Sequence, residues 1–332
     1  MGTHYLYGTI LTGEAVAANN RGDNIGNTTT LQKVFHQDDL HTSVSAEAIR
    51  FALRYRFQLQ DRASVNRSYD PVSGRLDLRD EKREYWADVL SEKKLPWIDD
   101  DLMGFMDAAA AKQESEEETT EEMEPEERQA KKKKAKGKTT KRPSPLALGR
   151  AVSLRPYRGE ISFNCVSGAK EKGSLSLYAA EMHTTEYQYS FGLNLNDVLV
   201  KAHVGELIEA IIDPPPVAGN HARFAFDFSP ASIVLRVTSA HSSKIQNCFE
   251  HDEENRTFTA KRLIQRVRSG DVPASELIIG GELSATVEGA SLKELGVTTD
   301  LGVAAAAKEA RRRLAKLGAE FESVATKTKE AS

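Results

Sequence analysis

A polar stretch near the N-terminus carries most of the hydrogen-bonding chemistry of this chain. It reads Asn19-Asn20-Arg21-Gly22-Asp23-Asn24-Ile25-Gly26-Asn27-Thr28-Thr29-Thr30-Leu31-Gln32-Lys33. Its amides, hydroxyls and two cations can donate to the oxygens of a phosphodiester chain, and its glycines allow close backbone approach. The same residue types also build ordinary turns, so the stretch taken alone favours a long turn. We expect a loop that lies between a strand and a helix.

The segment that follows this loop is predicted to be a helix over residues 41–57. Hydroxyl residues at its start can cap it. Its apolar residues recur at helical spacing, at Ala46, Ile49, Leu53 and Phe57, and predict a buried stripe. The two arginines at positions 50 and 54 lie one turn apart on another face, where they either contact phosphates or form a solvated surface.

Several separate blocks of sequence then resemble one protein family. The blocks are residues 11–27, 30–33, 41–50, 142–151 and 217–230. They resemble the DevR family of the RAMP superfamily, whose members are the backbone subunits that coat the guide RNA in type I CRISPR surveillance complexes (Cascade), of the I-B kind. The resemblance covers residues 4–250.

The resemblance implies an α+β fold, with an elaborated RRM/ferredoxin-like palm, a large inserted finger region and a thumb hairpin. Residues 1–60 and 145–300 would form a discontinuous palm, with the thumb hairpin at about 165–178. Residues 61–144 would be the inserted finger region, of which 107–142 are charged and expected to be disordered. Residues 301–332 would be a C-terminal helix and tail.

The function implied by the resemblance is that of a non-catalytic, multi-copy coat that binds the crRNA sugar-phosphate backbone whatever its sequence. The guide would then be presented for pairing with target DNA in antiviral defence. The implied partners are crRNA, target DNA, neighbouring copies in a helical filament, a 5′-handle-binding subunit, a large subunit and a repeat-processing endoribonuclease. No cofactor, metal or membrane is expected, and the implied location is the cytoplasm.

The residues expected to contact RNA are those with cationic or neutral hydrogen-bonding side chains in the matching blocks. Cations would meet phosphates, while amides and hydroxyls would meet phosphate and 2′-hydroxyl groups. They are Asn20, Arg21, Asn24, Asn27, Thr28, Lys33, His41, Ser43, Ser45, Arg50, Arg54, His221 and Arg223.

The composition of the chain limits the kind of RNA-binding surface that it can have. The chain has 332 residues, is 39% hydrophobic and carries a net charge of −4, which argues mildly against a globally basic nucleic-acid surface. Residues 114–127 hold nine glutamates and residues 128–142 hold nine cations, so these two blocks cancel and the remainder still carries −4. Any RNA-binding surface must therefore be local. Cys165 and Cys248 are far apart and read as buried free thiols, not as a zinc site.

Other elements are predicted from local patterns. Strands are expected over residues 4–12, 160–166, 174–178, 186–195, 222–228 and 232–238, and the second and third of these should form a hairpin. Helices are expected over residues 80–90, 204–212 and 303–324. Asp99-Asp100-Asp101 favours a helix start over a metal site. No RNP-type aromatic string is visible, so loops would bind the RNA.

Two alternatives remain open from sequence. An RRM-like endoribonuclease that processes CRISPR RNA would use His41 beside Asp38 and Asp39, or His221 beside Arg223, although neither histidine has another close in sequence. A more distant reading is a regulatory protein that acts through partners, with residues 114–142 as its docking arm.

Overall fold

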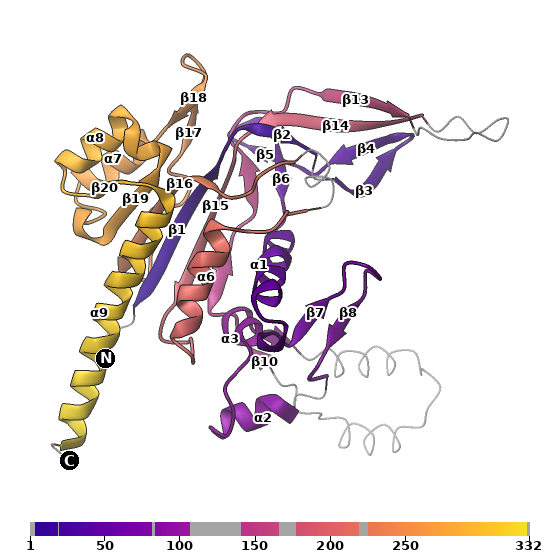
Figure 1. Ribbon diagram of the computed structural model, residues 1–332. Coiled ribbons are helices and arrows are strands. Elements are labelled where there is room, and N and C mark those ends of the chain that lie inside the picture. The colour runs from indigo at the N-terminus through magenta and orange to yellow at the C-terminus, as the bar shows by residue number, and fades with distance from the viewer. Residues whose placement is uncertain are drawn as a thin grey trace, which may run out of the picture.

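Four strands, one of which is divided into β11 and β12, and two helices form the centre of the molecule (Figure 1). The computed structural model describes residues 4–18, 20–81, 84–106, 141–165, 177–218 and 225–330. In chain order the central elements are β1 (Tyr5–Thr12), α1 (Ala46–Gln60), β11 (Leu146–Leu148) with β12 (Ala151–Ser153), β15 (Tyr187–Asn194), α6 (Ala202–Ile212) and β16 (Pro230–Thr238). β1 pairs with β15 and β16, and β11 and β12 pair with β15, all antiparallel. Because β11 and β12 act as two halves of one strand, this order is that of the predicted RRM/ferredoxin-like palm.

Further strands extend this sheet at both ends. β6 (Asp39–Val44) and β5 (Lys33–His36) continue it beyond β12, and β19 (Leu277–Gly281) and β20 (Thr298–Leu301) continue it beyond β16. The result is a nine-stranded sheet. The predicted strands 4–12, 186–195 and 232–238 are therefore confirmed.

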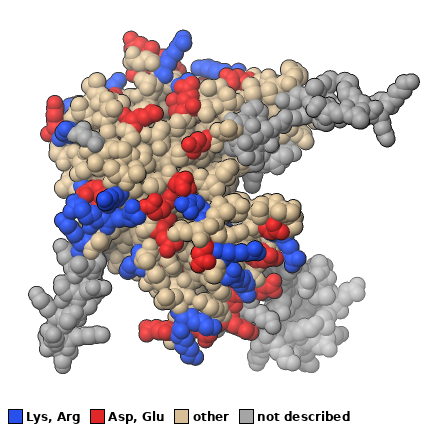
Figure 2. Space-filling model, viewed as in Figure 1, with Lys and Arg blue, Asp and Glu red and all other residues tan. Residues whose placement is uncertain are grey.

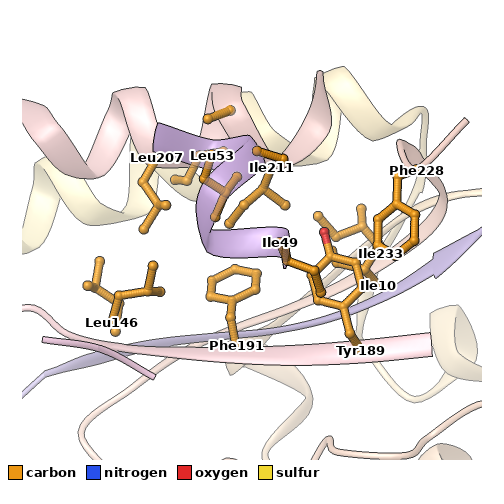
Figure 3. Packing of buried hydrophobic residues seen from close by; sticks show 14 of the residues in the cluster. Ile10, Ile49, Leu53, Leu146, Tyr189, Phe191, Leu207, Ile211, Phe228 and Ile233 are labelled. Carbon is orange, nitrogen blue, oxygen red and sulfur yellow. The ribbon is translucent and has the colours of Figure 1, made fainter. Parts of the chain in front are cut away.

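Both faces of the sheet are covered, because β1 sends alternate side chains into two separate cores. Leu6 and Ile10 face the first core, which includes residues of α1, α6 and α9 (Val303–Glu330). Figure 3 shows Ile10 and Phe191 below residues of α1 and α6 in this core. Tyr7 and Leu11 face the second core, which includes α7 (Lys261–Arg268), α8 (Val287–Glu294) and residues 245–249. No open sheet face is therefore left here for bases to stack on.

The helix predicted over residues 41–57 is α1, which begins at Ala46. Ser45 caps it by accepting a hydrogen bond from the Ala48 backbone N–H at 3.2 Å. Ile49, Leu53 and Phe57 are buried as predicted. The predicted helices 204–212 and 303–324 are α6 and α9, and α9 buries Ala306, Ala307 and Ala310 against the sheet.

A second sheet projects from the palm (Figure 1) and is called the arm sheet below. It has the order β13 (Glu160–Cys165), β14 (Leu177–Thr185), β4 (Thr28–Leu31) and β3 (Asn20–Ile25), and β2 (Ala15–Ala17) also pairs with β14. The predicted hairpin appears as the antiparallel pair β13 and β14, whereas its connecting residues 166–176 lie outside the described chain.

The polar stretch 19–33 is not the loop that we expected. β3 and β4 form a hairpin with Gly26 in the left-handed region (φ 61°), and β4 pairs in parallel with β14. Polar residues can form these strands because β14 supplies backbone partners from about 150 residues further along the chain, which no local pattern reveals.

The inserted region begins after α1. It contains η1 (Arg62–Ser64), the hairpin β7 (Arg67–Tyr69) and β8 (Leu76–Leu78), α2 (Glu84–Leu90), α3 (Ile98–Met103), and the pair β9 (Phe105–Met106) and β10 (Lys141–Arg142). The helix predicted over 80–90 is α2, which starts later than expected. Most of the charged block, residues 107–140, lies outside the described residues.

The strand predicted over residues 222–228 is wrong over the residues that the structure describes. Residues 219–224 lie outside the described chain, and residues 225–228 form no strand. Phe226 and Phe228 instead insert their rings into the first core against Tyr187, with centroid distances of 5.5 and 6.0 Å. The remaining elements are the hairpin β17 (Glu250–Asp252) and β18 (Thr257–Thr259), and the short helices η2 (Ala274–Glu276) and η3 (Glu282–Ala285).

Candidate nucleic-acid interface

The turn between β3 and β4 presents the exposed part of the predicted site. Asn24 and Asn27 are exposed there, and Thr28 is half-buried. The Asn27 carbonyl accepts a hydrogen bond from Ala179 N–H at 3.0 Å, which ties the turn to β14. Asn20 and Arg21 lie in β3, of which only the backbone is described at these positions.

The positive charge of Lys33 is paired with a carboxylate of the same protein. Its Nζ lies 2.5 Å from Glu181 Oε2 and 4.8 Å from the centre of the Tyr157 ring. The same carboxylate oxygen accepts a hydrogen bond from Leu31 N–H at 2.7 Å. Burial and the negative charge of Glu181 raise the pKa of Tyr157. The cation predicted to meet phosphate therefore meets a carboxylate from the arm sheet.

His41 and Ser43 are buried, which corrects their predicted role at the surface. His41 is 4% exposed, and its Nδ1–H donates to the Ser153 carbonyl at 2.7 Å. Burial lowers the pKa of His41, so the ring is neutral at pH 7. Ser43 Oγ accepts a hydrogen bond from Arg150 at 3.1 Å. Both side chains hold β6 in place instead of facing a ligand.

The three site residues predicted on α1 have structural roles. Ser45 caps the helix, and Arg50 and Arg54 connect it to neighbouring segments. Arg50 donates to the Leu146 carbonyl at 2.7 Å and to Ser144 Oγ at 3.2 Å, which fixes α1 to β11. Arg54 is largely buried beside Asp99, with Nε and Oδ2 3.4 Å apart, and burial lowers its pKa. Both arginines are thus engaged by neighbouring segments of the protein, and their contacts with RNA stay a prediction. His221 and Arg223 lie outside the described residues.

One cation that the residue-type reasoning missed is Arg150, which is exposed between β11 and β12. It reaches Ser43 at the N-terminal end of α1, where the helix dipole favours anions. It also contributes to the lowered pKa of Glu47, whose largest cause is a hydrogen bond from the backbone. The only signal in the sequence was its place in the 142–151 block that carries the family resemblance.

Asp99, Asp100 and Asp101 occupy the first turn of α3, as predicted, but they are buried and anchor neighbouring segments. Asp101 accepts hydrogen bonds from Arg142 at 2.6 Å, from Leu199 and Val200 N–H at 3.0 Å, and from His203 at 2.9 Å. Burial would raise the pKa of Asp101, but these hydrogen bonds outweigh it and lower the pKa. Throughout the described residues, no group of three or more His, Cys, Asp or Glu side chains is arranged to hold a metal ion. Cys248 is a buried free thiol, with its pKa raised to about 12 by burial.

Together, the fold and this surface define an RRM-type scaffold whose sheet is covered on both faces at its centre and whose exposed polar groups lie on a hairpin tip and beside a helix N-terminus. The chain belongs to the DevR/Csa2 family, because the family model described as "CRISPR-associated negative auto-regulator DevR/Csa2" matches residues 10–267. The resemblance stated from sequence is thereby confirmed at the level of the family.

Known relatives and solved structures agree. The protein from Myxococcus xanthus (strain DK1622) described as "CRISPR-associated protein Cas7/Cst2/DevR" is 38% identical over 320 residues, which cover 93% of this chain and 97% of that protein. A chain of a "CRISPR RNA-guided surveillance complex" is similar in fold, with a TM-score of 0.56 and 14% identity, over 93% of this chain and 99% of that chain. A chain of a complex titled "CRISPR RNA-guided surveillance complex, pre-nicking" matches with a TM-score of 0.51 and 14% identity, over 91% and 97% of the two chains.

Proposed function

We propose that this protein is a multi-copy backbone subunit of a type I, I-B-like Cascade complex, which coats the crRNA without reading its sequence. The observation that carries the proposal is the match of nearly the whole chain both to a Cas7/Cst2/DevR protein and to the fold of surveillance-complex subunits. The exposed donors fit this role, because Asn24, Asn27 and Arg150 offer groups for phosphate and sugar and no base-reading pocket.

Sequence specificity then comes from pairing between the guide and target DNA. Because the centre of the palm sheet is covered on both faces, the RNA runs over its edges and not across its centre. A net charge of −4 is compatible with this role, since each copy holds only a short stretch of guide and the copies add their contacts along the strand.

The proposed partners are neighbouring copies in an open helical filament, the 5′-handle-binding subunit, the large subunit and the repeat-processing endoribonuclease. The proposed location is the cytoplasm, where the guide is made and used. None of the described helices combines the length and the apolar character needed to cross a membrane.

We further propose that the protein does not cut RNA. Support comes from His41, whose Nδ1 is committed to Ser153 inside the protein. Asp38 and Asp39 lie at the exposed turn between β5 and β6. Incubation with CRISPR-repeat RNA should leave it intact, whereas cleavage that disappears in Asp39→Ala or His221→Ala would favour the endoribonuclease.

Purification of the full chain from cells that express a repeat array tests the main proposal. The protein should carry RNA and form open oligomers. Arg150→Ala should weaken single-stranded RNA binding for any sequence and lower the slope of log K against log salt by about 0.7. Arg268→Ala, an exposed arginine on α7, is the matched control and should change neither quantity. An RNA-free monomer without affinity for single-stranded RNA would overturn the proposal.

A further inference from the structure

A cluster of aromatic side chains lies on the outer side of α1. Phe51 and Tyr55 are one helical turn apart, with ring planes parallel within 9° and centroids 6.3 Å apart. Tyr69 of β7 meets both rings nearly edge-on, at 5.1 and 5.9 Å. These three residues are called the aromatic platform below. Exposed leucines extend its apolar surface, with Leu59 58% exposed on α1 and Leu76 57% exposed opposite Tyr69 on β8.

Packing of the core does not account for the platform. The buried stripe of α1 runs through Ile49, Leu53 and Phe57, so Phe51 and Tyr55 point to the other side of the helix. The hairpin that carries Tyr69 is held in place, because the Gln58 side chain hydrogen-bonds both Tyr69 N–H and its carbonyl at 2.7 Å. Exposed apolar clusters rimmed by polar groups mark interaction sites. The platform is thus pre-arranged, with Phe51 exposed and with Tyr55 and Tyr69 half-buried.

Uncommitted cations lie beside the platform. Arg62 lies two residues beyond the end of α1, at the start of η1, and Arg67 shares the face of β7 with Tyr69. Both arginines are exposed, and within the described part of the chain their guanidinium groups have no hydrogen-bond or ion-pair partner.

Two acids close in sequence to these arginines, in contrast, are engaged. Asp61 accepts a hydrogen bond from Ala63 N–H at 2.8 Å, and Asp70 accepts hydrogen bonds from Val72 N–H and from the Ser73 hydroxyl at 3.0 and 2.6 Å. Figure 2 shows acidic and basic side chains interspersed over the lower part of the view, where Figure 1 places α1, β7 and β8. Any anion held here is therefore held by a few local contacts.

We propose that the platform stacks unpaired bases of single-stranded nucleic acid while Arg62 and Arg67 contact the neighbouring phosphates. Exposed rings with flanking cations are how single strands are bound without sequence preference. Successive bases of a stacked strand are nearly parallel, as are the rings of Phe51 and Tyr55. The inference rests on the proposed function in one respect: the strand reaches the platform from the other end of α1, where Arg150 lies. The bases are those of the guide, because the guide is the strand that Arg150 is proposed to hold.

The test uses the full-length protein and single-stranded RNA that carries 2-aminopurine, whose fluorescence is quenched by stacking. Phe51→Ala with Tyr55→Ala should abolish quenching and weaken binding by about 5- to 150-fold, the range of stacking energies per base. The salt slope should stay unchanged, because no phosphate contact is lost. Arg62→Ala with Arg67→Ala should do the reverse, keeping the quenching and lowering the slope by about 1.4.

Two further variants keep the test decisive. Phe51→Leu retains apolar bulk and the fold but removes the flat ring, so it should still reduce quenching. Phe35→Ala removes an 84% exposed ring on β5, away from the platform, and should have no effect. An equal loss in Phe35→Ala would overturn the proposal.

Two arms distinguish the source of the bases. In one arm 2-aminopurine is placed in the guide, and in the other it is placed in single-stranded DNA added to protein that already carries guide. Quenching in the guide arm supports the proposal, whereas quenching in the DNA arm alone would overturn it and assign the platform to a target strand. Absence of quenching in both arms, while guide is retained, overturns the platform and leaves the proposed function standing. Unchanged quenching in Phe51→Ala with Tyr55→Ala, together with altered sedimentation, would instead assign this surface to contacts between copies. Quenching by DNA in a protein that carries no RNA would overturn the proposed function but not the stacking of bases on the platform.

Discussion

Lys33 of the palm sheet and Glu181 of the arm sheet form an ion pair that joins the two sheets. Their side chains are 22% and 15% exposed, so the pair lies just below the surface. Glu181 also accepts a hydrogen bond from the Leu31 N–H, and thus occupies the two donors that a phosphate would use in its place. A carboxylate held in this way competes with RNA for Lys33.

Glu181→Gln should release Lys33 and strengthen RNA binding. If Lys33 then meets a phosphate, the salt slope should steepen by about 0.7. Electrophoretic or anisotropy titrations at several salt concentrations measure both effects. Glu160→Gln, on the neighbouring strand β13, removes the same charge without freeing Lys33 and serves as control. Equal effects of the two variants would show that only net charge matters.

Asp101→Asn should loosen the inserted region from the palm. The carboxylate is fully buried and joins Arg142 to α6 through His203, so loss of its charge breaks a buried pair. The expected cost is about 3 kcal/mol, the lower end for such pairs. Urea unfolding measures it. Asp88→Asn, which breaks the half-exposed pair with Lys94, should leave the urea midpoint nearly unchanged.

Stability should fall as the pH drops from about 6.5 toward 4, because of His183. Burial lowers the pKa of His183 to about 4, so the folded state keeps the ring neutral while the unfolded chain binds a proton. Since the unfolded state binds more protons in this window, lower pH favours unfolding. Urea midpoints at pH 7 and pH 5 should differ clearly in the wild type and less in His183→Gln. The same difference in both proteins would contradict this origin, which would then lie with other groups such as His41.

Gly8→Ala should destabilise the centre of the sheet. A Cβ atom at Gly8 would lie 2.1 Å from the ring of Phe191, its partner on β15. Overpacking of this kind costs about 1–3 kcal/mol. Thermal unfolding should show partial rescue by Phe191→Leu, so that the double variant is more stable than the sum of the two single losses. Simple additivity would mean that the two positions do not share this space.

The sequence predicts the palm well because its signals are local. Aromatic and β-branched residues mark β1, alternating apolar residues mark β15, and the Ser45 cap with its Ile49 and Leu53 stripe marks α1. The candidate site is predicted less well. Arg54, His41 and Ser43 have polar side chains that look exposed in sequence, but their partners Asp99, Ser153 and Arg150 come from 45 to 112 residues away.

The polar hairpin of β3 and β4 shows the same limit. Its partner β14 comes from far along the chain, so the polar residues of 19–33 read as a turn. The aromatic platform was missed for another reason. Phe51 and Tyr55 occur within a helix, where aromatic residues usually indicate core, and only the helix orientation shows that they face outward.

The pairing of β9 with β10 has a consequence for the length of the inserted region. Met106 and Lys141 lie within the inserted region at the two ends of segment 107–140, and these two residues are partners across a two-stranded ladder. Because both ends of the intervening segment are fixed side by side, doubling its length costs only about 0.6 kcal/mol in loop-closure entropy. We therefore expect this position to tolerate insertions, so that a reporter domain or affinity tag can be placed there while the palm and the arm sheet keep their geometry.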